Sequence, residues 1–342
     1  MKKNFFYFAF AAVAAISLTA CSSDDDSNDS GSSTPTVNLP KPVNADNAAV
    51  YTLTGGGIAS TTPAGESAST HVLASLEVTE SEQVLFQVTE SDNTPFYVID
   101  RPTSVVGNLF TFNSNKAKGT IQRVESAPAT TRQGLVEYAI ILNIQLYHNG
   151  TWVEFKTAPE GAPATKQTQT PSTDDVTTWL VRTWSFVTGN LPAATFDVHL
   201  ASNGVTAFKD FFSTNGTLDL ETTILKEAVE VRNVGLSAKD KDDLKRNIKN
   251  ITVSADKFVI AYADGRGDDV AKWSWTDNYK TTMKIQLMDN KMGNKFFNND
   301  TKIDVAFNDN RCNLTLKVLF TDDNGKQWDS SLTVHMQYAT VQ

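Results

Sequence analysis

Apolar residues alternate with polar ones along much of this 342-residue chain, and no other feature constrains its fold more. Residues 135–147 carry the longest such run. Another covers 314–320, and residues 328–338 alternate back after an Asp-Asn-Gly turn. A period of two places one face of a strand against a core and leaves the other in water. Asn149-Gly150 follows the first run and supplies the positive φ angles of a hairpin turn. The chain is therefore predicted to be all-β and mostly antiparallel.

Two segments of low hydrophobicity divide the chain into folded modules. Residues 21–44 are rich in Ser, Asp, Asn and Pro, which predicts a tether. Residues 158–173 contain three prolines and no periodic apolar face, which predicts a linker. The modules are then an N-terminal β domain over 45–157, either a β-sandwich or a small barrel, and a C-terminal β domain over 174–342. Because domain boundaries fall in exposed polar segments, few contacts are expected between the modules.

The first 20 residues carry the pattern of an export signal. Two lysines precede an apolar run over 5–18, which is shorter than the roughly 20 residues of a membrane-spanning helix. The run ends in Leu-Thr-Ala before Cys21, and this order resembles the lipobox of bacterial lipoproteins. The resemblance implies cleavage before Cys21 and a lipid on its thiol, so a membrane would be a partner of the mature chain. The alternative is an ordinary secretory peptide with a chance cysteine.

A serine and acid cluster follows this cysteine directly, made of Ser22, Ser23, Asp24, Asp25 and Asp26. The cluster resembles the surface-export signal of lipoproteins in the Bacteroidota phylum. The alternative is a merely solvated tether, since charged and serine-rich stretches stay disordered in any case. The resemblance implies a protein that is held at the outer membrane by its lipid and faces the cell exterior.

Charge and cysteine content exclude two classes of function. The formal net charge is −9, and loss of residues 1–20, with two lysines and no acid, makes it −11. Such a chain has no electrostatic footprint for nucleic acid. Once Cys21 carries lipid, Cys312 has no partner for an intramolecular disulfide, which excludes a disulfide scaffold. For Cys312 itself, a half-buried structural role is favoured over a reactive thiol.

No residue cluster predicts catalysis or a metal site. The four histidines are scattered along the sequence. The run from Asp264 to Asp269, with two glycines, could offer oxygen ligands to calcium. However, Arg266 stands among those ligands, so we expect a solvated hairpin loop, and its Arg-Gly-Asp tripeptide is too short to indicate adhesion. Neither a phosphate-binding loop nor a Gly-x-Ser-x-Gly motif is present. The chain is predicted not to be an enzyme and to use no cofactor.

Two short motifs open the C-terminal module. A predicted short helix over 174–181 leads into Thr183 and Trp184, and Phe212 is followed by Asn215-Gly216-Thr217 at a predicted hairpin. This order resembles the lipocalin-like domains of Bacteroidota lipoproteins. The resemblance implies an antiparallel barrel of roughly eight to ten strands, with Trp184 plugging its closed end.

Two features depart from that family pattern. Arg182 stands where the family usually has glycine. A second predicted helix, over about residues 237–249 with Ser237 at its N-cap, interrupts the strand series. A β-sandwich or another mixed β fold is therefore the alternative for this module.

Trp273 and Trp275 share one face of a predicted strand. Such pairs are usually core residues, and the alternative is an aromatic platform that contacts a ligand. The barrel resemblance favours a surface lipoprotein that binds an apolar or amphipathic small molecule, since eight-stranded barrels hold one small ligand. The competing functions are a structural or adhesion component and a glycan-capture accessory lipoprotein, neither with a small-molecule pocket.

Overall fold

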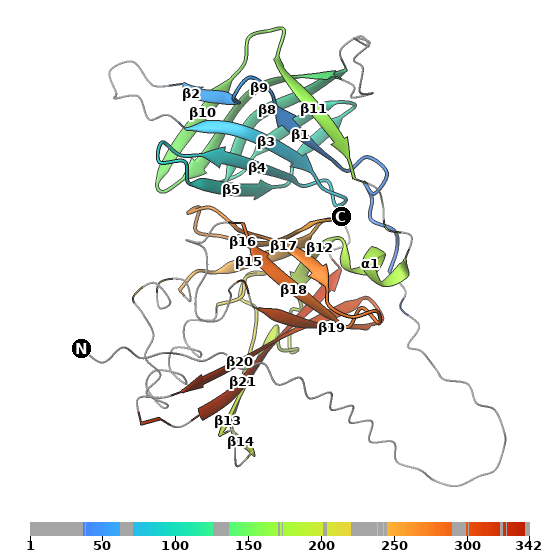
Figure 1. The fold of residues 1–342 in the computed structure, drawn as a ribbon, viewed down its shortest axis with the longest axis vertical. Coiled ribbons are helices and arrows are strands. Elements are labelled where there is room, and N and C mark those ends of the chain that lie inside the picture. Colours follow the sequence, from blue (N-terminus) through green and yellow to red (C-terminus); the bar gives the residue numbers. More distant parts are fainter. Residues whose placement is uncertain are drawn as a thin grey trace, which may run out of the picture.

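The computed structural model describes residues 37, 39–61, 71–125, 137–169, 172, 174–200, 204–219, 238, 242, 245–288, 299, 301–321, 324–325 and 327–338. Within them, nearly all regular structure is antiparallel β, arranged in two sheets, so the predicted all-β class is confirmed. Figure 1 shows the sheets as two bodies, one above the other, with the helix α1 (Asp175–Leu180) beside their junction. No helix in the described part of the chain is both long and apolar enough to cross a membrane.

The N-terminal module is one strongly curled sheet of 11 strands. Its strands are β1 (Ala49–Leu53), β2 (Ile58–Thr61), β3 (Val72–Val78), β4 (Val84–Thr89), β5 (Pro95–Asp100), β6 (Ser104–Val106), β7 (Leu109–Asn113), β8 (Ala117–Glu125), β9 (Glu137–His148), β10 (Thr151–Lys156) and β11 (Ala162–Thr168). Two positions in this sheet are each filled by two successive strands, because β1 and β2 share one edge of β3 and β10 and β11 share one edge of β9. β4–β5 and β8–β7–β6 continue the sheet on the other edges of β3 and β9. One buried apolar core lies inside this single sheet, so the module is not a two-sheet sandwich.

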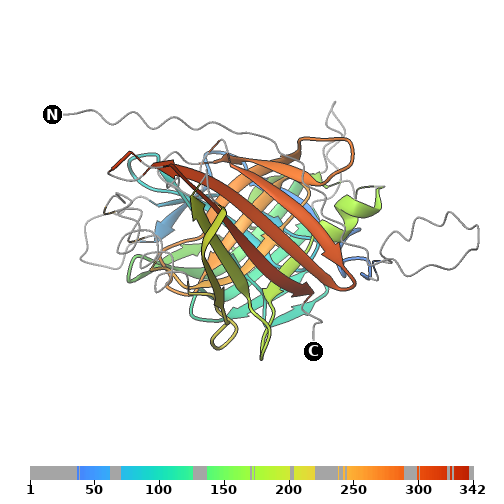
Figure 2. The same ribbon diagram turned by 90° about the horizontal axis from the view of Figure 1, so that it is seen from below.

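The C-terminal module closes into a barrel. Its strands are β12 (Thr183–Phe186), β13 (Ala194–Leu200), β14 (Gly204–Phe211), β15 (Ile248–Val253), β16 (Lys257–Tyr262), β17 (Asp269–Trp275), β18 (Thr282–Leu287), β19 (Lys302–Asn308), β20 (Arg311–Thr321) and β21 (Gln327–Tyr338). Strands β15 to β21 pair in order, and β12 pairs with both β15 and β21, which closes eight strands into a ring. The predicted barrel is confirmed, and Figure 2 shows its long strands (red) crossing obliquely when seen from below.

The predicted linker is wrong over residues 162–168, which form β11. This strand lies between β1 and β9 of the N-terminal sheet, and Ala164 is buried in the N-terminal core. Its inward-facing side chains include Ala162 and Ala164, which are too small to show as an apolar stripe in the sequence. The boundary between the modules therefore remains a prediction, with α1 as the first element after the N-terminal sheet.

The helix predicted over about 237–249 is also wrong at its C-terminal end. Ala238 and Asp242 are helical, but Ile248 already lies in β15 and is buried in the barrel core. The apolar position that suggested a helical stripe thus belongs to a strand. Most of the segment before Lys245 lies outside the described residues.

The two sheets are in direct contact, contrary to the expectation of few contacts between the modules. A separate apolar cluster joins β4 and β5 to β16 and β17, and consists of Leu85, Tyr97, Ile99, Val259, Ala261 and Val270. Polar contacts surround this cluster, and we call the cluster and these contacts the seam. The low-hydrophobicity segment 158–173 suggested separated modules, but strand faces far from it in sequence make the contact.

Candidate functional site

Aromatic side chains fill the end of the barrel next to α1. Trp184 is fully buried, and its indole N–H donates to the carbonyl oxygen of Leu180 at 3.0 Å. The ring centroid of Phe307 lies 5.7 Å from that of Trp179 and 6.2 Å from that of Trp184. This end is where the family resemblance places its plug. The contribution of Trp184 to stability remains a prediction.

Arg182, the departure from the family pattern, caps the helix at this end. Its guanidinium donates to the carbonyl oxygens of Trp179 at 2.7 Å and Thr178 at 3.1 Å, in the last turn of α1. It also donates to Pro40 O at 3.1 Å and lies 4.9 Å from the ring centroid of Tyr338. Burial lowers the pKa of Arg182 to about 10, so the side chain stays cationic at neutral pH. A cation suits the negative end of the helix and satisfies carbonyls that would otherwise lack partners.

Trp273 and Trp275 are half-buried on β17 and pack against the barrel core. Their ring centroids are 5.4 Å apart, with an interplanar angle of 88°. Trp273 donates its indole N–H to Ser254 O and Trp275 donates to Thr177 Oγ1, both at 2.9 Å. Since both N–H groups already have protein acceptors, only the ring faces could contact a ligand. Their role as ligand-contact residues is untested.

The opposite end of the barrel interior is less well buried. Leu316, Leu332 and Val334 point inward, because they share a strand face with the buried Leu314 and Met336. All three are only partly buried, although they pack against the same core. Partly buried apolar side chains thus occur along the barrel interior, with Phe307 beside α1 and these three further along.

Cys312 is fully buried in the barrel core. Burial raises the pKa of its thiol well above the usual range, although the nearby guanidinium of Arg182 acts in the opposite direction. A thiol that stays protonated is a poor nucleophile. Cys312 is thus buried more completely than the half-buried position that the sequence predicted.

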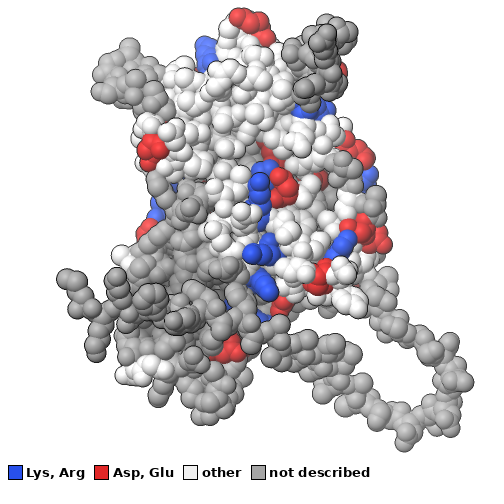
Figure 3. All heavy atoms as spheres, in the orientation of Figure 1, with Lys and Arg blue, Asp and Glu red and all other residues white. Residues whose placement is uncertain are grey.

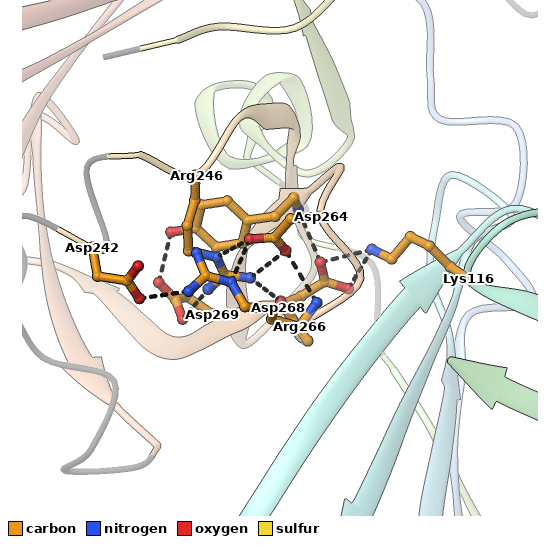
Figure 4. A network of polar contacts seen from close by, with 9 residues as sticks. Lys116, Asp242, Arg246, Asp264, Arg266, Asp268 and Asp269 are labelled. Carbon is orange, nitrogen blue, oxygen red and sulfur yellow. Dashed lines mark hydrogen bonds and ion pairs between the residues drawn. The ribbon is translucent and has the colours of Figure 1, made fainter. Parts of the chain in front are cut away.

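Asp268 is the centre of the seam. Its carboxylate is fully buried and accepts from Lys116 Nζ at 2.6 Å, from the N–H of Ile99 at 2.6 Å and from the N–H of Tyr262 at 2.9 Å. The Asp268 N–H donates to Tyr97 O at 2.8 Å. Figure 4 shows the carboxylate directed towards Lys116, on the N-terminal sheet. The predicted solvated loop is wrong here, because this residue joins the two modules and is closed to an adhesion partner.

The other charges of this loop are paired within the C-terminal module (Figure 4). Arg246 donates to both carboxylate oxygens of Asp264, at 2.8 and 3.0 Å, and to Gly267 O. Partial burial acts to raise the pKa of Asp264, but Arg246 and Arg266 outweigh it and hold this pKa well below its usual range. Within the described residues, no group of His, Cys, Asp and Glu side chains is arranged to hold a metal ion.

Hydroxyl and amide groups extend the seam beside β12. Gln83 Oε1 accepts from Thr183 Oγ1 at 3.0 Å and from Thr252 Oγ1 at 2.6 Å. Ser81 Oγ accepts from the N–H of Thr183 at 2.8 Å. Thr183 precedes Trp184 in the motif that suggested a lipocalin-like barrel. The first residue of this motif, Thr183, therefore lies in the seam, and the second, Trp184, lies in the barrel core.

Two buried acids lie at the same junction. Glu77 is paired with Lys257 of the C-terminal module, with Oε2 and Nζ 2.7 Å apart. Glu80 accepts a hydrogen bond from the N–H of Ala255 at 3.2 Å. Burial raises the pKa of Glu80 to about 7, and the neighbouring Glu77 adds to the effect. Glu80 can therefore change its charge near neutral pH while it faces the other module.

A cleft of about 330 Å³ opens beside the seam. Its lining consists of Asn115, Lys116, Ser185, Asn215, Gly216, Thr217, Lys249, Asn250, Tyr262 and Ala263. Lys116 is already neutralised by Asp268, so Lys249 is the exposed cation in this lining. Amides and hydroxyls in the lining can form hydrogen bonds with a small molecule, and about half of the accessible lining surface is apolar.

Two of the scattered histidines meet in the N-terminal module. His148 is buried, with Nε2 3.1 Å from Glu90 Oε1, and its ring stacks on Phe96 with centroids 3.7 Å apart. His71 Nε2 lies 4.0 Å from the same carboxylate oxygen. Burial lowers the pKa of His148. Sequence spacing gave no sign of this group, because its members come from three different strands or strand ends.

The glycines of the 264–269 loop were the overlooked signal for the seam. Gly265 and Gly267 both have positive φ, at 73° and 99°. A side chain at Gly265 would collide with Tyr147 of the N-terminal sheet. Glycine at such a position indicates close approach of another part of the chain, and here that part is the other module.

The residues of the predicted export signal lie outside the described residues. This applies to Cys21 and to the cluster Ser22, Ser23, Asp24, Asp25 and Asp26. Their proposed roles rest on the sequence.

Comparisons with known proteins do not assign the chain to a family. No family model matches it, and no curated protein matches it. One similar solved structure is a protein of unknown function of the DUF3598 family from Nostoc punctiforme PCC 73102, with 9% identity, 88% of this chain and 100% of that chain covered, and a TM-score of 0.19. A second is a protein provisionally assigned to the outer membrane of Bacteroides fragilis NCTC 9343, with 12% identity, 84% of this chain and 96% of that chain covered, and a TM-score of 0.20. A third is a Trp-176-Ala mutant of transferrin binding protein B from Haemophilus parasuis Hp5, with 8% identity, 78% of this chain and 55% of that chain covered, and a TM-score of 0.21. These identities and TM-scores are too low to transfer a function.

Proposed function

We propose that this chain is a surface lipoprotein of the Bacteroidota type, and that its C-terminal barrel binds one apolar or amphipathic small molecule. The observation that carries the proposal is the barrel itself. Eight strands close, Trp184 and Phe307 pack together at the α1 end, and inward-facing apolar side chains are only partly buried further along the interior. Small barrels of this kind either fill their interior with side chains or leave room for one ligand.

The binding end is proposed to be the one that carries Leu316, Leu332 and Val334. Burying these partly exposed side chains against a ligand would remove apolar surface from water, at about 25 cal/mol per Å². The cleft beside the seam suits a wholly apolar molecule less well, since the amides and hydroxyls in its mixed lining would lose water without gaining partners.

A fluorescent polyene fatty acid tests this site on the purified full chain. Leu332→Gln, which places an amide inside the barrel, should weaken binding about tenfold or more. Thr333→Gln is the matched control, because Thr333 is the next residue of β21 and faces the opposite side of the sheet. Thermal melts check that both variants fold. Equal binding by both variants, or no binding by the native chain, would reject a ligand site in the barrel.

The cellular location of the protein is proposed from the sequence pattern of its N-terminus. Cleavage before Cys21, with a lipid on that thiol, would hold the chain on a membrane, since several acyl chains give stable attachment. Cys21→Ala should abolish labelling by a fatty-acid analogue. Changing Asp24, Asp25 and Asp26 together to Ala should leave labelling intact and protect the protein from external protease on whole cells. A labelled Cys21→Ala variant would reject the lipid site, and unchanged protease digestion would reject the export signal.

A second candidate function is a structural or adhesion role. The hairpin of β6 and β7 exposes Val105, Val106 and Leu109 to 41%, 70% and 37% of their surface, and β6 is an edge strand of the described sheet. Exposed apolar edge strands tend to pair with other chains. Sedimentation of the native chain over a range of concentrations should then show self-association that Val106→Asp abolishes. A native chain that stays monomeric throughout would remove the support for this role.

A further inference from the structure

Lysines cross the outer face of the C-terminal barrel in a row. Lys272 on β17, Lys284 on β18 and Lys302 on β19 are exposed and lie on three neighbouring strands. Lys284 stands directly opposite Lys302 in the strand register. Figure 3 shows basic side chains in a column that runs from the junction of the modules down over the barrel, with acidic side chains beside its upper end. We call these three residues the lysine row.

The charges of Lys272 and Lys284 are not balanced by an ion pair within the described part of the fold, whereas Lys302 takes part in an interaction of its own. Like charges directly opposite each other on a sheet destabilise it, and Lys284 faces such a neighbour. No ion pair of Lys272 or Lys284 is present among the described residues, whereas Lys257 above the row is paired with Glu77 and Lys317 below it with Asp304. The chain as a whole is acidic, with a net charge of −9, so a local cluster of cations differs in sign from the net charge of the chain.

The side chains between these lysines suit sugar hydroxyls. Ser274 stands opposite Lys284 and Gln286 stands opposite Lys272, and both are exposed. Tyr279, at the tip of the hairpin that joins β17 to β18, is exposed to 87% of its surface. An exposed aromatic ring can stack on a sugar ring, and hydroxyl and amide groups can bind its hydroxyls.

We propose that the lysine row binds an acidic polysaccharide, a linear glycan with carboxylate or sulfate groups. Lys284 and Lys302 stand opposite each other on strands about 4.8 Å apart, and Lys272 lies diagonally from Lys284, at roughly 7–8 Å. These intervals are comparable to one or two sugar units of an extended chain. Single-stranded nucleic acid fits less well, because its general binding sites use aromatic platforms along the path of the strand. Here a single aromatic side chain, Tyr279, is exposed at one hairpin tip beside the lysine row, and it does not form such a series of platforms. The proposal is independent of a ligand inside the barrel, since these side chains face outward.

The test uses the full chain with polygalacturonate, heparin and neutral dextran as probes. The native chain should bind both acidic glycans and not dextran, and high salt should weaken binding. Replacing Lys272 and Lys284 together by Gln should weaken binding about tenfold or more, since each lost contact removes a charge pair. The matched control replaces Lys118 and Lys156, exposed lysines of the N-terminal sheet, by Gln, and removes the same net charge. It should bind as the native chain does.

Each other outcome contradicts the proposal. Equal weakening in the control pair would mean that net charge alone is sensed. Equal binding of dextran would remove the role of the lysines, and tighter binding of an oligothymidylate than of either glycan would identify a nucleic-acid surface. No binding of any probe would reject the surface outright. Lys284→Gln should leave the melting temperature unchanged or raise it slightly, because it relieves the repulsion from Lys302, so a loss of binding cannot be assigned to unfolding.

Discussion

The core of the C-terminal barrel and the seam between the modules are both buried, yet their chemistry is opposite. The core around Trp184 is built from apolar side chains, with Arg182 as the buried cation at its α1 end. In the seam, buried charges surround a small apolar cluster, and Asp268 and Lys116 are among these charges. Apolar burial stabilises a fold in proportion to area, whereas the attraction within a buried ion pair is largely offset by its desolvation. The core should therefore supply stability, and the seam should determine how the modules dock.

The largest single effect is expected in the core. Trp184→Ala removes a fully buried side chain and its hydrogen bond to Leu180 O. The expected loss in the free energy of unfolding is about 3–5 kcal/mol, the usual range for a buried aromatic. Urea denaturation of the full chain measures it, with Phe212→Ala as the control, because Phe212 is exposed to 52% of its surface. A loss below about 1 kcal/mol would show that Trp184 is not the plug.

A somewhat smaller effect is expected in the seam. Asp268→Asn keeps the shape of the side chain but leaves the Lys116 ammonium buried without its counter-charge. The expected cost is on the order of 3 kcal/mol. Adding Lys116→Met to the same chain should recover part of that loss, and a double-mutant cycle measures the coupling. If the two losses simply add, Lys116 and Asp268 do not stabilise the junction as a pair.

The next largest effect is expected in how the free energy of unfolding depends on pH, through Glu80 in the seam. In the folded chain Glu80 keeps its proton up to about pH 7, whereas a free glutamate releases it near 4.5. The folded state therefore binds more protons between these values, and stability falls as pH rises through them. Glu80→Gln should stabilise the chain by on the order of 1–3 kcal/mol at about pH 8 and have little effect near pH 5. Urea midpoints at both pH values decide this, and an equal effect at both would contradict the raised pKa.

The exposed edge of the same network should contribute least to stability. Arg266 and Asp242 form an ion pair at 2.5 Å, but their side chains are exposed to 38% and 60%. Pairs of this kind contribute about 0–1 kcal/mol, because water screens the charges and the side chains lose freedom. Asp242→Asn should accordingly shift the urea midpoint only slightly. A cost comparable to that of Asp268→Asn would show that burial is not what separates the two ion pairs.

The same contrast explains what the sequence could predict. The barrel core is local: alternating residues of β20 and β21 face inward, and the Asp-Asn-Gly turn between these strands is visible in the sequence. The seam is not local, since Lys116 and Asp268 are 152 positions apart and neither stands in a periodic pattern. Strand β11 escaped notice because it buries alanines. An isolated ion pair leaves no periodic trace, and only the two loop glycines hinted at close approach.

The last prediction separates the core from the seam directly. Residues 174–342 contain α1, Trp184 and every strand of the barrel, while all partners of Asp268 in the N-terminal sheet are absent. If the core supplies the stability of the barrel, this fragment should unfold cooperatively in urea and keep a far-ultraviolet β signature. Trp184→Ala should then cost the same in the fragment as in the full chain, within about 0.5 kcal/mol, because sites without shared partners are additive. The side chain of Trp184 faces the barrel interior and Thr183 faces the seam, so the two surfaces are separated by the sheet itself. A fragment that never folds would show that the seam is required for the barrel, and would reject the proposed boundary at residue 174.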